Sequence, residues 1–128
     1  MAEAVLSRES EVIGFGTDSK VIIRDLGDIP GGKTLDMTGY NGEGDNLKAG
    51  HIIVKTNAGE YKPLGLNSGK TDYVTVGSTD TVVGVLKATI RKAEPMAAIL
   101  TMGQVQEAAL PFTVTTAIKT ALPNIQFI

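Results

Sequence analysis

Glycine is the residue type that most constrains the fold of this chain. Fifteen of the 128 residues are glycine, and they divide the apolar residues into short runs. Glycine weakens the interior of helices and strands and is preferred in tight turns. Several of the runs between the glycines are rich in Val, Ile and Thr, which favour strands over helices. This spacing predicts a mainly β domain in which short strands are joined by turns.

The candidate strands have either an alternation of apolar and polar residues or a continuous apolar run. The run at residues 82–86 is typical of a strand that is buried on both faces. Gly103, inside another candidate strand, indicates a bulge or a close approach of two backbones. The expected strands cover residues 21–23, 34–38, 51–56, 60–64, 81–86, 96–105 and 125–128, with the third and fourth paired as a hairpin.

One short helix is expected near the C-terminus, over residues 115–122. Ala117, Ile118, Ala121 and Leu122 share one face at helical spacing, and Pro123 ends the helix. Residues 17–128 therefore form one β-rich domain with a single C-terminal helix.

Residues 1–16 are polar and mixed in charge, and their apolar side chains are isolated. Gly14 and Gly16 flank one of these side chains and disfavour a helix there. We interpret this segment as an extended arm outside the core, with a frayed terminus of no function as the alternative. The apolar residues of the arm are Val5, Leu6, Val12, Ile13 and Phe15.

Composition excludes several classes of chemistry and of partner. The absence of Cys excludes disulfides, cysteine-ligated zinc, iron–sulfur clusters and thiol catalysis. A net charge of −2, from 12 basic and 14 acidic side chains, argues against a nucleic-acid partner. The N-terminus lacks the features of a secretory signal, and no apolar stretch is long enough for a membrane span. We therefore expect synthesis in a cytosol-like compartment and no membrane partner.

Residues 27–34 match the phosphate-loop pattern G-x-x-x-x-G-K-[ST]. A phosphate loop must be followed by a helix whose free amides face the anion. Here Leu35 and Met37 alternate with polar residues as in a strand, and further glycines follow. We interpret the match as a proline–glycine β-turn between two strands, with nucleotide binding as the less favoured alternative.

The remaining chemical candidates are weak. Asn41, Glu43 and Asp45 alternate with glycines and could offer oxygen atoms to Ca²⁺, but the bidentate Glu that completes an EF-hand loop is missing. A polar loop explains the same residues. His51 is the only histidine, and no nucleophile or orienting partner can be named for it. We expect it at a strand edge or an interface, and we expect no catalytic residue, cofactor, metal or small-molecule substrate.

Four segments of the second half carry a resemblance to a known family. These segments are residues 49–54 (AGHIIV), 82–86 (VVGVL), 99–105 (ILTMGQV) and 117–128 (AIKTALPNIQFI). Together they resemble the head decoration, or capsid-stabilising, proteins of tailed phages, of the type found on phage lambda. The similarity covers residues 48–128. Residues 65–80 are longer than the corresponding loop of that family, and the family's tryptophan is missing.

The resemblance implies a small β-clip-like domain that forms homotrimers on the outer surface of the phage head. Such trimers occupy threefold and quasi-threefold positions of the expanded shell and reinforce it against the pressure of packaged DNA. It further implies synthesis in the host cytoplasm and an N-terminal arm that pairs with a strand of the major capsid protein. Strand addition would place the arm's apolar residues in pockets, and three arms on one trimer would raise the effective concentration of each.

Two other functions stay open at the level of sequence. A head-fibre base or tail component would use the same trimer to display another protein. A small trimeric β-clip enzyme or ligand-binding module would place its sites between subunits.

Overall fold

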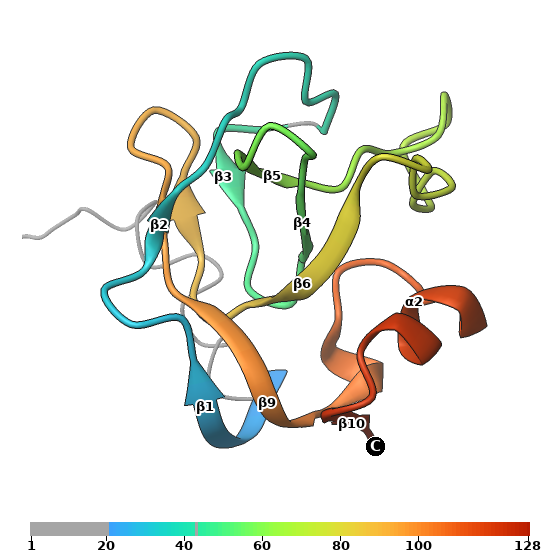
Figure 1. The fold of residues 1–128 in the computed structure, drawn as a ribbon. Helices are drawn as coiled ribbons and strands as arrows, with labels where there is room; N and C mark the ends of the chain where they lie inside the picture. The colour runs from blue at the N-terminus through green and yellow to red at the C-terminus, as the bar shows by residue number, and fades with distance from the viewer. Residues whose placement is uncertain (1–20, 43) are drawn as a thin grey trace, which may run out of the picture.

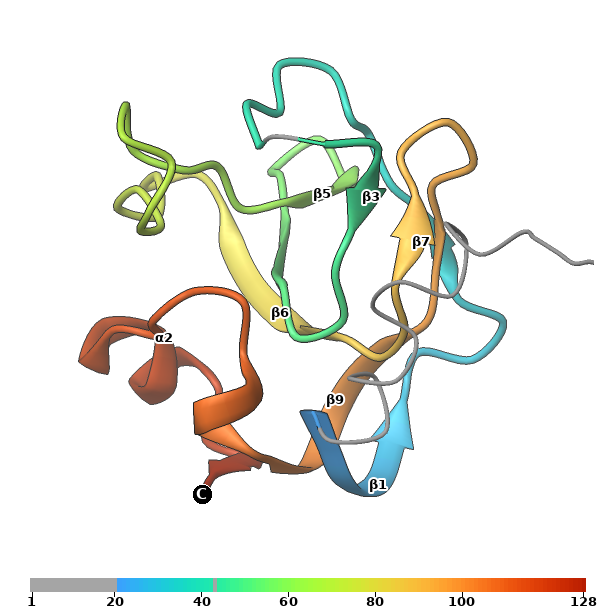
Figure 2. The same cartoon turned by 180° about the vertical axis from the view of Figure 1, so that it is seen from behind.

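The fold is described from a computed structural model, which covers residues 21–42 and 44–128 (Figures 1 and 2). The proposed arm at residues 1–16, with its five apolar residues, lies outside the described residues, as does Glu43.

The main sheet has six strands. Five of them follow the order β1-β9-β6-β4-β5, and the sixth, β10, pairs with β9. All neighbours in this sheet are antiparallel except β10 and β9, which are parallel. Strand β9 is the centre of the arrangement, because β1, β6 and β10 all pair with it (Figure 1). The bounds are β1 Ile22–Asp28, β4 Ile52–Lys55, β5 Tyr61–Pro63, β6 Thr81–Leu86, β9 Ile99–Val105 and β10 Ile125–Phe127.

Two small ladders lie beside the main sheet. Strand β2 (Lys33–Thr34) pairs with β8 (Met96–Ala97), and β3 (Asn46–Leu47) pairs with β7 (Ile90–Arg91), both antiparallel. Figure 2 shows β3 and β7 side by side on the face turned away from the viewer in Figure 1. Each of these ladders joins two segments that are distant in the sequence. The ladders therefore hold connections between strands of the main sheet against one another.

Helix α2 (Thr116–Ala121) follows the 3₁₀ helix η2 (Glu107–Ala109) and leads into β10. The Thr115 hydroxyl caps it by accepting a hydrogen bond from the amide of Ile118 at 3.3 Å. Ile118 and Leu122 are buried in the core, whereas Ala117 and Ala121 are exposed. The apolar face of the helix is therefore narrower than its sequence pattern indicates.

The core consists of two groups of buried side chains on opposite faces of the sheet. Along β4, Ile52 and Val54 belong to one group and Ile53 to the other. Strand β6 divides in the same way, with Val85 on the first face and Leu86 on the second. Each such side chain contributes about 1.5–3 kcal/mol when it is removed from water. The prediction of a strand buried on both faces is confirmed for residues 82–86, in which only Val83 is partly exposed, whereas Thr81 is exposed.

The expected fold class is confirmed: the described chain is mainly β, with one short C-terminal helix. Three strand predictions need correction. The first strand does not end before Asp25 but continues to Asp28 as β1, with two irregularities in its register around Gly27. Of the strand expected at 34–38, only Thr34 lies in a strand, as the second residue of β2. The Asp36 carboxylate accepts a hydrogen bond from the amide of Thr38 and turns the chain there. The strand expected at 96–105 is divided at Ala98 into β8 and β9.

Among the described residues, no helix has the length and apolar character that crossing a membrane requires.

Candidate functional site

His51 stands immediately before β4 and its side chain is 0 % exposed, so the expectation of a strand-edge or interface histidine is wrong. Three aromatic rings surround it edge to face, with centroid distances of 5.4 Å to Tyr40, 5.2 Å to Tyr73 and 5.7 Å to Phe112. These rings come from three separate loops. His51 therefore holds several loops against the sheet from inside the core.

The hydrogen bonding of His51 fixes the tautomer of the ring, and burial keeps the ring neutral. Nε2 lies 2.9 Å from the carbonyl oxygen of Leu64, and because a carbonyl only accepts, Nε2 carries the hydrogen. Nδ1 has no hydrogen-bond partner among the described residues. Burial disfavours the charged ring and lowers the pKa of His51 to about 4, a shift that the nearby Lys92 charge reinforces. The neutral ring is enclosed by apolar neighbours and is suited to packing.

The phosphate-loop match at residues 27–34 is a β-turn, as expected. The amide of Gly32 donates to the carbonyl of Ile29 at 3.1 Å, with Pro30 and Gly31 between them. Gly31 has a φ of 75°, which completes the Pro-Gly type II turn. Lys33 and Thr34 then enter β2 and not a helix. The local geometry of a phosphate loop is therefore missing.

Asn41, the first residue of the candidate calcium loop, makes structural hydrogen bonds to the backbone of Leu66. The side-chain amide of Asn41 donates to the carbonyl of Leu66 at 2.7 Å, and its oxygen accepts from the amide of Leu66 at 3.0 Å. Asn41 thus pairs with Leu66 as a neighbouring strand would. Glu43 lies outside the described residues. In the part of the chain that the structure describes, no three His, Cys, Asp or Glu residues gather as a metal site.

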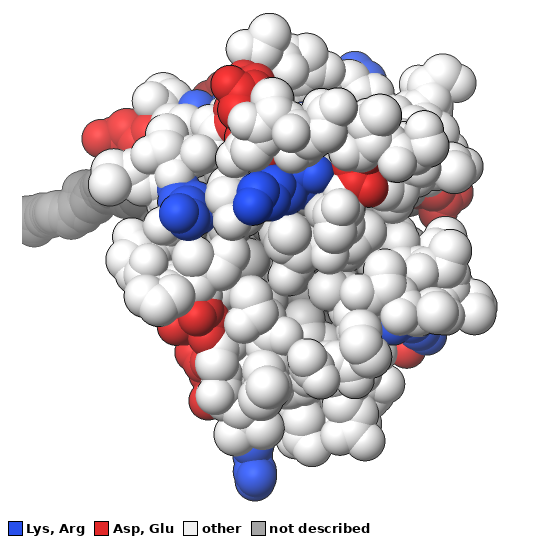
Figure 3. Space-filling model, in the orientation of Figure 1, with Lys and Arg blue, Asp and Glu red and all other residues white. Residues whose placement is uncertain are grey.

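Exposed apolar side chains occur on the strands around β9, next to the charged residues Arg24 and Asp25 of β1. Within residues 21–42 and 44–128, six large apolar side chains are exposed, and four of them belong to β1, β9 or the residue after β10. Met102 of β9 lies opposite Gly27 in the register of β1, and the amide of Ile128 donates to Val105 of β9. The lower half of Figure 3, over β9 and β10, carries few charged side chains. We call these four residues the apolar strip: Ile23, Leu26, Met102 and Ile128.

Two lysine ammonium groups lie near one aromatic ring elsewhere on the surface. Lys33 Nζ and Lys55 Nζ lie 5.4 Å and 5.6 Å from the centroid of the Tyr61 ring. They come from β2 and the end of β4, and Tyr61 begins β5. Sequence reasoning missed this cluster, since the three residues share no motif. The pairing of β4 with β5, which was predicted, could have placed Lys55 opposite Tyr61.

The comparisons with known proteins identify no family for this chain: no family model matches it, and neither does any curated protein or solved structure.

Proposed function

We propose that this protein is a structural decoration protein of a tailed-phage head. It binds the exterior of the expanded shell as a homotrimer and stabilises the shell against internal pressure. The observation that carries the proposal is the placement of the four segments that resemble the lambda-type family. In the described chain they form β4, β6, β9 and the α2–β10 unit, which are consecutive hydrogen-bonded neighbours in the main sheet.

The glycines inside these segments support the same proposal. A Cβ on Gly84 would lie 2.2 Å from the carbonyl oxygen of Leu100, and a Cβ on Gly103 would lie 2.1 Å from that of Arg24. Both glycines therefore stand where two backbones approach closely, which is a requirement of this sheet. The resemblance thus rests on residues that the packing of β6, β9 and β1 needs.

The apolar strip supports association between copies. Monomeric proteins carry scattered exposed apolar residues, but a group on neighbouring strands is typical of an interaction surface. Leu26 is 60 % exposed and Ile128 is 58 % exposed, so both would lose water contact in a subunit interface. We assign the strip to contacts within the trimer.

Stabilisation of a shell requires no catalytic chemistry. A protein that binds only the expanded lattice shifts the equilibrium toward that lattice by its difference in affinity for the two states. The second contact of each subunit with the shell is the arm, whose apolar residues pair with the major capsid protein. Three linked arms raise the effective concentration of each, so that a weak contact suffices.

The experiment measures the binding of the purified protein to expanded, undecorated phage shells by co-sedimentation. We expect saturable binding, and weaker binding for an arm variant that carries Ile13→Asp and Phe15→Asp. Multi-angle light scattering tests the trimer, which Leu26→Ser together with Met102→Ser should dissociate. Shells that take up no protein at saturating concentration would refute the decoration function. Equal binding of the arm variant would refute only the role of the arm.

A further inference from the structure

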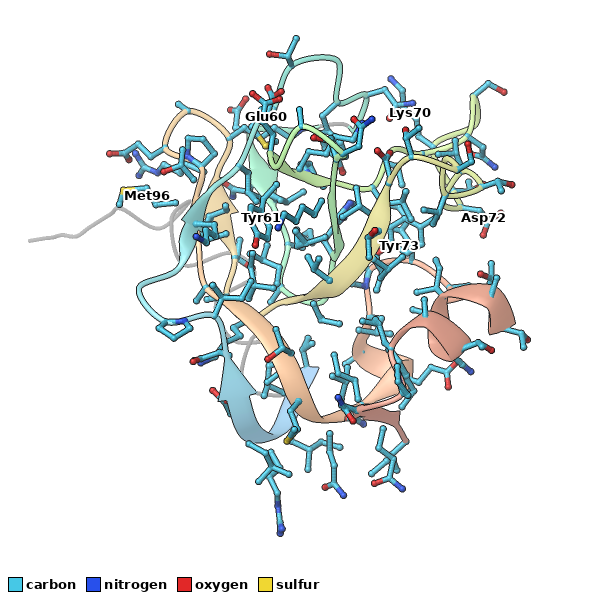
Figure 4. The ribbon with its side chains drawn as sticks, in the orientation of Figure 1. Glu60, Tyr61, Lys70, Asp72, Tyr73 and Met96 are labelled. Atoms are coloured by element: carbon cyan, nitrogen blue, oxygen red, sulfur yellow. The ribbon has the colours of Figure 1, made fainter. Side chains whose placement is uncertain are left out.

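The ring of Tyr61 is approached by two lysine side chains that are both exposed. Lys33 approaches the ring from β2 and Lys55 approaches it from β4. Basic side chains gather on this face of the molecule in Figure 3, over β2 and β4. Figure 4 shows Tyr61 near the middle of the same face. A protein with a net charge of −2 thus concentrates positive charge at one place.

These two ammonium groups differ from their neighbours in having no acidic partner among the described residues. Lys62, the residue after Tyr61, pairs with Asp80 at 3.6 Å. Lys87 contacts Asp25 and also Asp28, the latter at 2.7 Å. Lys33 and Lys55 have only the ring face of Tyr61, which attracts cations but does not neutralise them. A pair of uncompensated cations on one ring favours an anionic group from outside the chain.

Nearby carboxylates limit the length of this positive surface. Asp36 lies beside the same strand, because its amide donates to the carbonyl of Tyr61 at 2.7 Å. A hydrogen bond from the Thr38 amide holds the pKa of Asp36 below its ordinary value and keeps it negative. Glu60 precedes Tyr61 in the chain. A long polyanion would meet these charges, whereas a short acidic segment fits between them.

An apolar contact lies next to Lys33. Met96 of β8 pairs with Thr34 of β2 and is 74 % exposed, the highest value among the exposed large apolar residues of the described chain. Figure 4 shows it pointing away from the fold beside β2. An open hollow of about 310 Å³ is lined here by residues 31–34 and 96–98. Methionine adapts its shape to different partners, so this hollow suits an apolar side chain.

We propose that Lys33, Lys55, Tyr61 and Met96 form a docking surface for a short acidic segment of a protein partner. Two carboxylates of the segment pair with the two ammonium groups, one with each, and an adjacent apolar side chain enters the hollow beside Met96. Nucleic acid fits less well, because its affinity depends on the release of many counterions, and on this surface of the described chain only Lys33 and Lys55 lack an acidic partner. The identity of the partner, as a protein on the outer surface of the shell, rests on the proposed function.

The test uses a fluorescent peptide of alternating Glu and Val and a matched peptide of alternating Gln and Val. Fluorescence anisotropy with the full chain should detect binding of the Glu peptide only. Lys33→Gln together with Lys55→Gln should weaken it roughly tenfold, since both exposed ion pairs are lost. Lys48→Gln removes an exposed lysine outside this surface and should change nothing. Binding should also fall in about 1 M salt, where the Debye length is about 3 Å.

Each outcome separates this proposal from the decoration function. Equal binding of the Glu and Gln peptides, or equal binding by the double variant and wild type, would overturn the docking surface. Displacement of the Glu peptide by an equimolar DNA duplex would also overturn it, in favour of a nucleic-acid site. Shells that bind wild type and the double variant equally would keep the decoration function and refute this contact with the shell. Peptide binding needs no shell, so it is measured whether or not shells take up the protein.

Discussion

Gly84 of β6 lies directly against the backbone carbonyl of Leu100 in β9. A Cβ at position 84 would stand 2.2 Å from that oxygen and 2.8 Å from Cγ2 of Ile99. The backbone oxygen cannot rotate away, because β6 and β9 are hydrogen-bonded at the adjacent pair Val85 and Leu100. Gly84 therefore sets the separation of the two strands at the centre of the sheet.

Gly84→Ala should destabilise the protein by about 1–3 kcal/mol or more, since the added methyl group forces β6 and β9 apart. The free energy of unfolding from urea titration measures the effect. Gly69→Ala is the matched control, because a Cβ there lies no closer than 3.8 Å to its neighbours. We expect the control to stay within about 0.5 kcal/mol of wild type. Equal stability of the two variants would contradict the close approach.

The buried ring of His51 should make stability depend on pH. Its pKa is about 4 in the fold and 6.5 when the ring is solvated, so the unfolded chain binds the proton first. The contribution of the neutral His51 ring to the free energy of unfolding is fully present above pH 6.5. It is lost progressively as the pH falls from 6.5 through about 4. The difference corresponds to about 3 kcal/mol at most, at 1.36 kcal/mol per pKa unit.

His51→Gln separates this titration from the packing of the ring. Glutamine can still donate to the Leu64 carbonyl but does not titrate, so the variant should be less stable at pH 7 and lose the His51 contribution to the pH dependence between pH 6.5 and 4. Urea titrations of both proteins at several pH values test this. If the variant keeps the full pH dependence of wild type, His51 is not its cause.

The sequence predicts the parts of the fold that have a local signal. The apolar run of β6, the hairpin of β4 and β5, the turn at Pro30 and Gly31, and the helix capped by Thr115 all follow from pattern or turn chemistry. The ladders β2–β8 and β3–β7 do not, because a strand of two residues has no period. Their pairing depends on where the main sheet places distant loops.

The side chains that contact His51 could not be predicted from the sequence. Tyr40, Tyr73 and Phe112 reach His51 from three loops, and nothing in their local sequence indicates that they meet. A histidine before an apolar strand is compatible with an edge, an interface or a core. Only the tertiary packing decides, and here it places the ring in the core.

Lys87 should contribute little to stability despite its two acidic partners. Hydrogen bonds from its ammonium group to Asp25 and Asp28 raise the pKa of Lys87, but all three side chains are partly exposed to solvent. Solvent and salt screen such contacts, so Lys87→Met should cost less than about 1 kcal/mol at low salt and almost nothing at about 1 M salt. Urea titrations at the two salt concentrations measure this. A cost that does not change with salt would mean that packing of the lysine stem dominates.

Asn41 should matter more than its position in a polar loop indicates. Its side chain satisfies both the amide and the carbonyl of Leu66, whose own side chain is buried in the core. Asn41→Ala leaves both backbone groups without this partner, which should cost about 1–3 kcal/mol. Urea titration gives the loss, and faster hydrogen exchange of the Leu66 amide locates it. Asn57→Ala, in the exposed turn between β4 and β5, is the control and should leave that amide protected. Unchanged exchange at Leu66 in Asn41→Ala would show that the asparagine does not hold this loop.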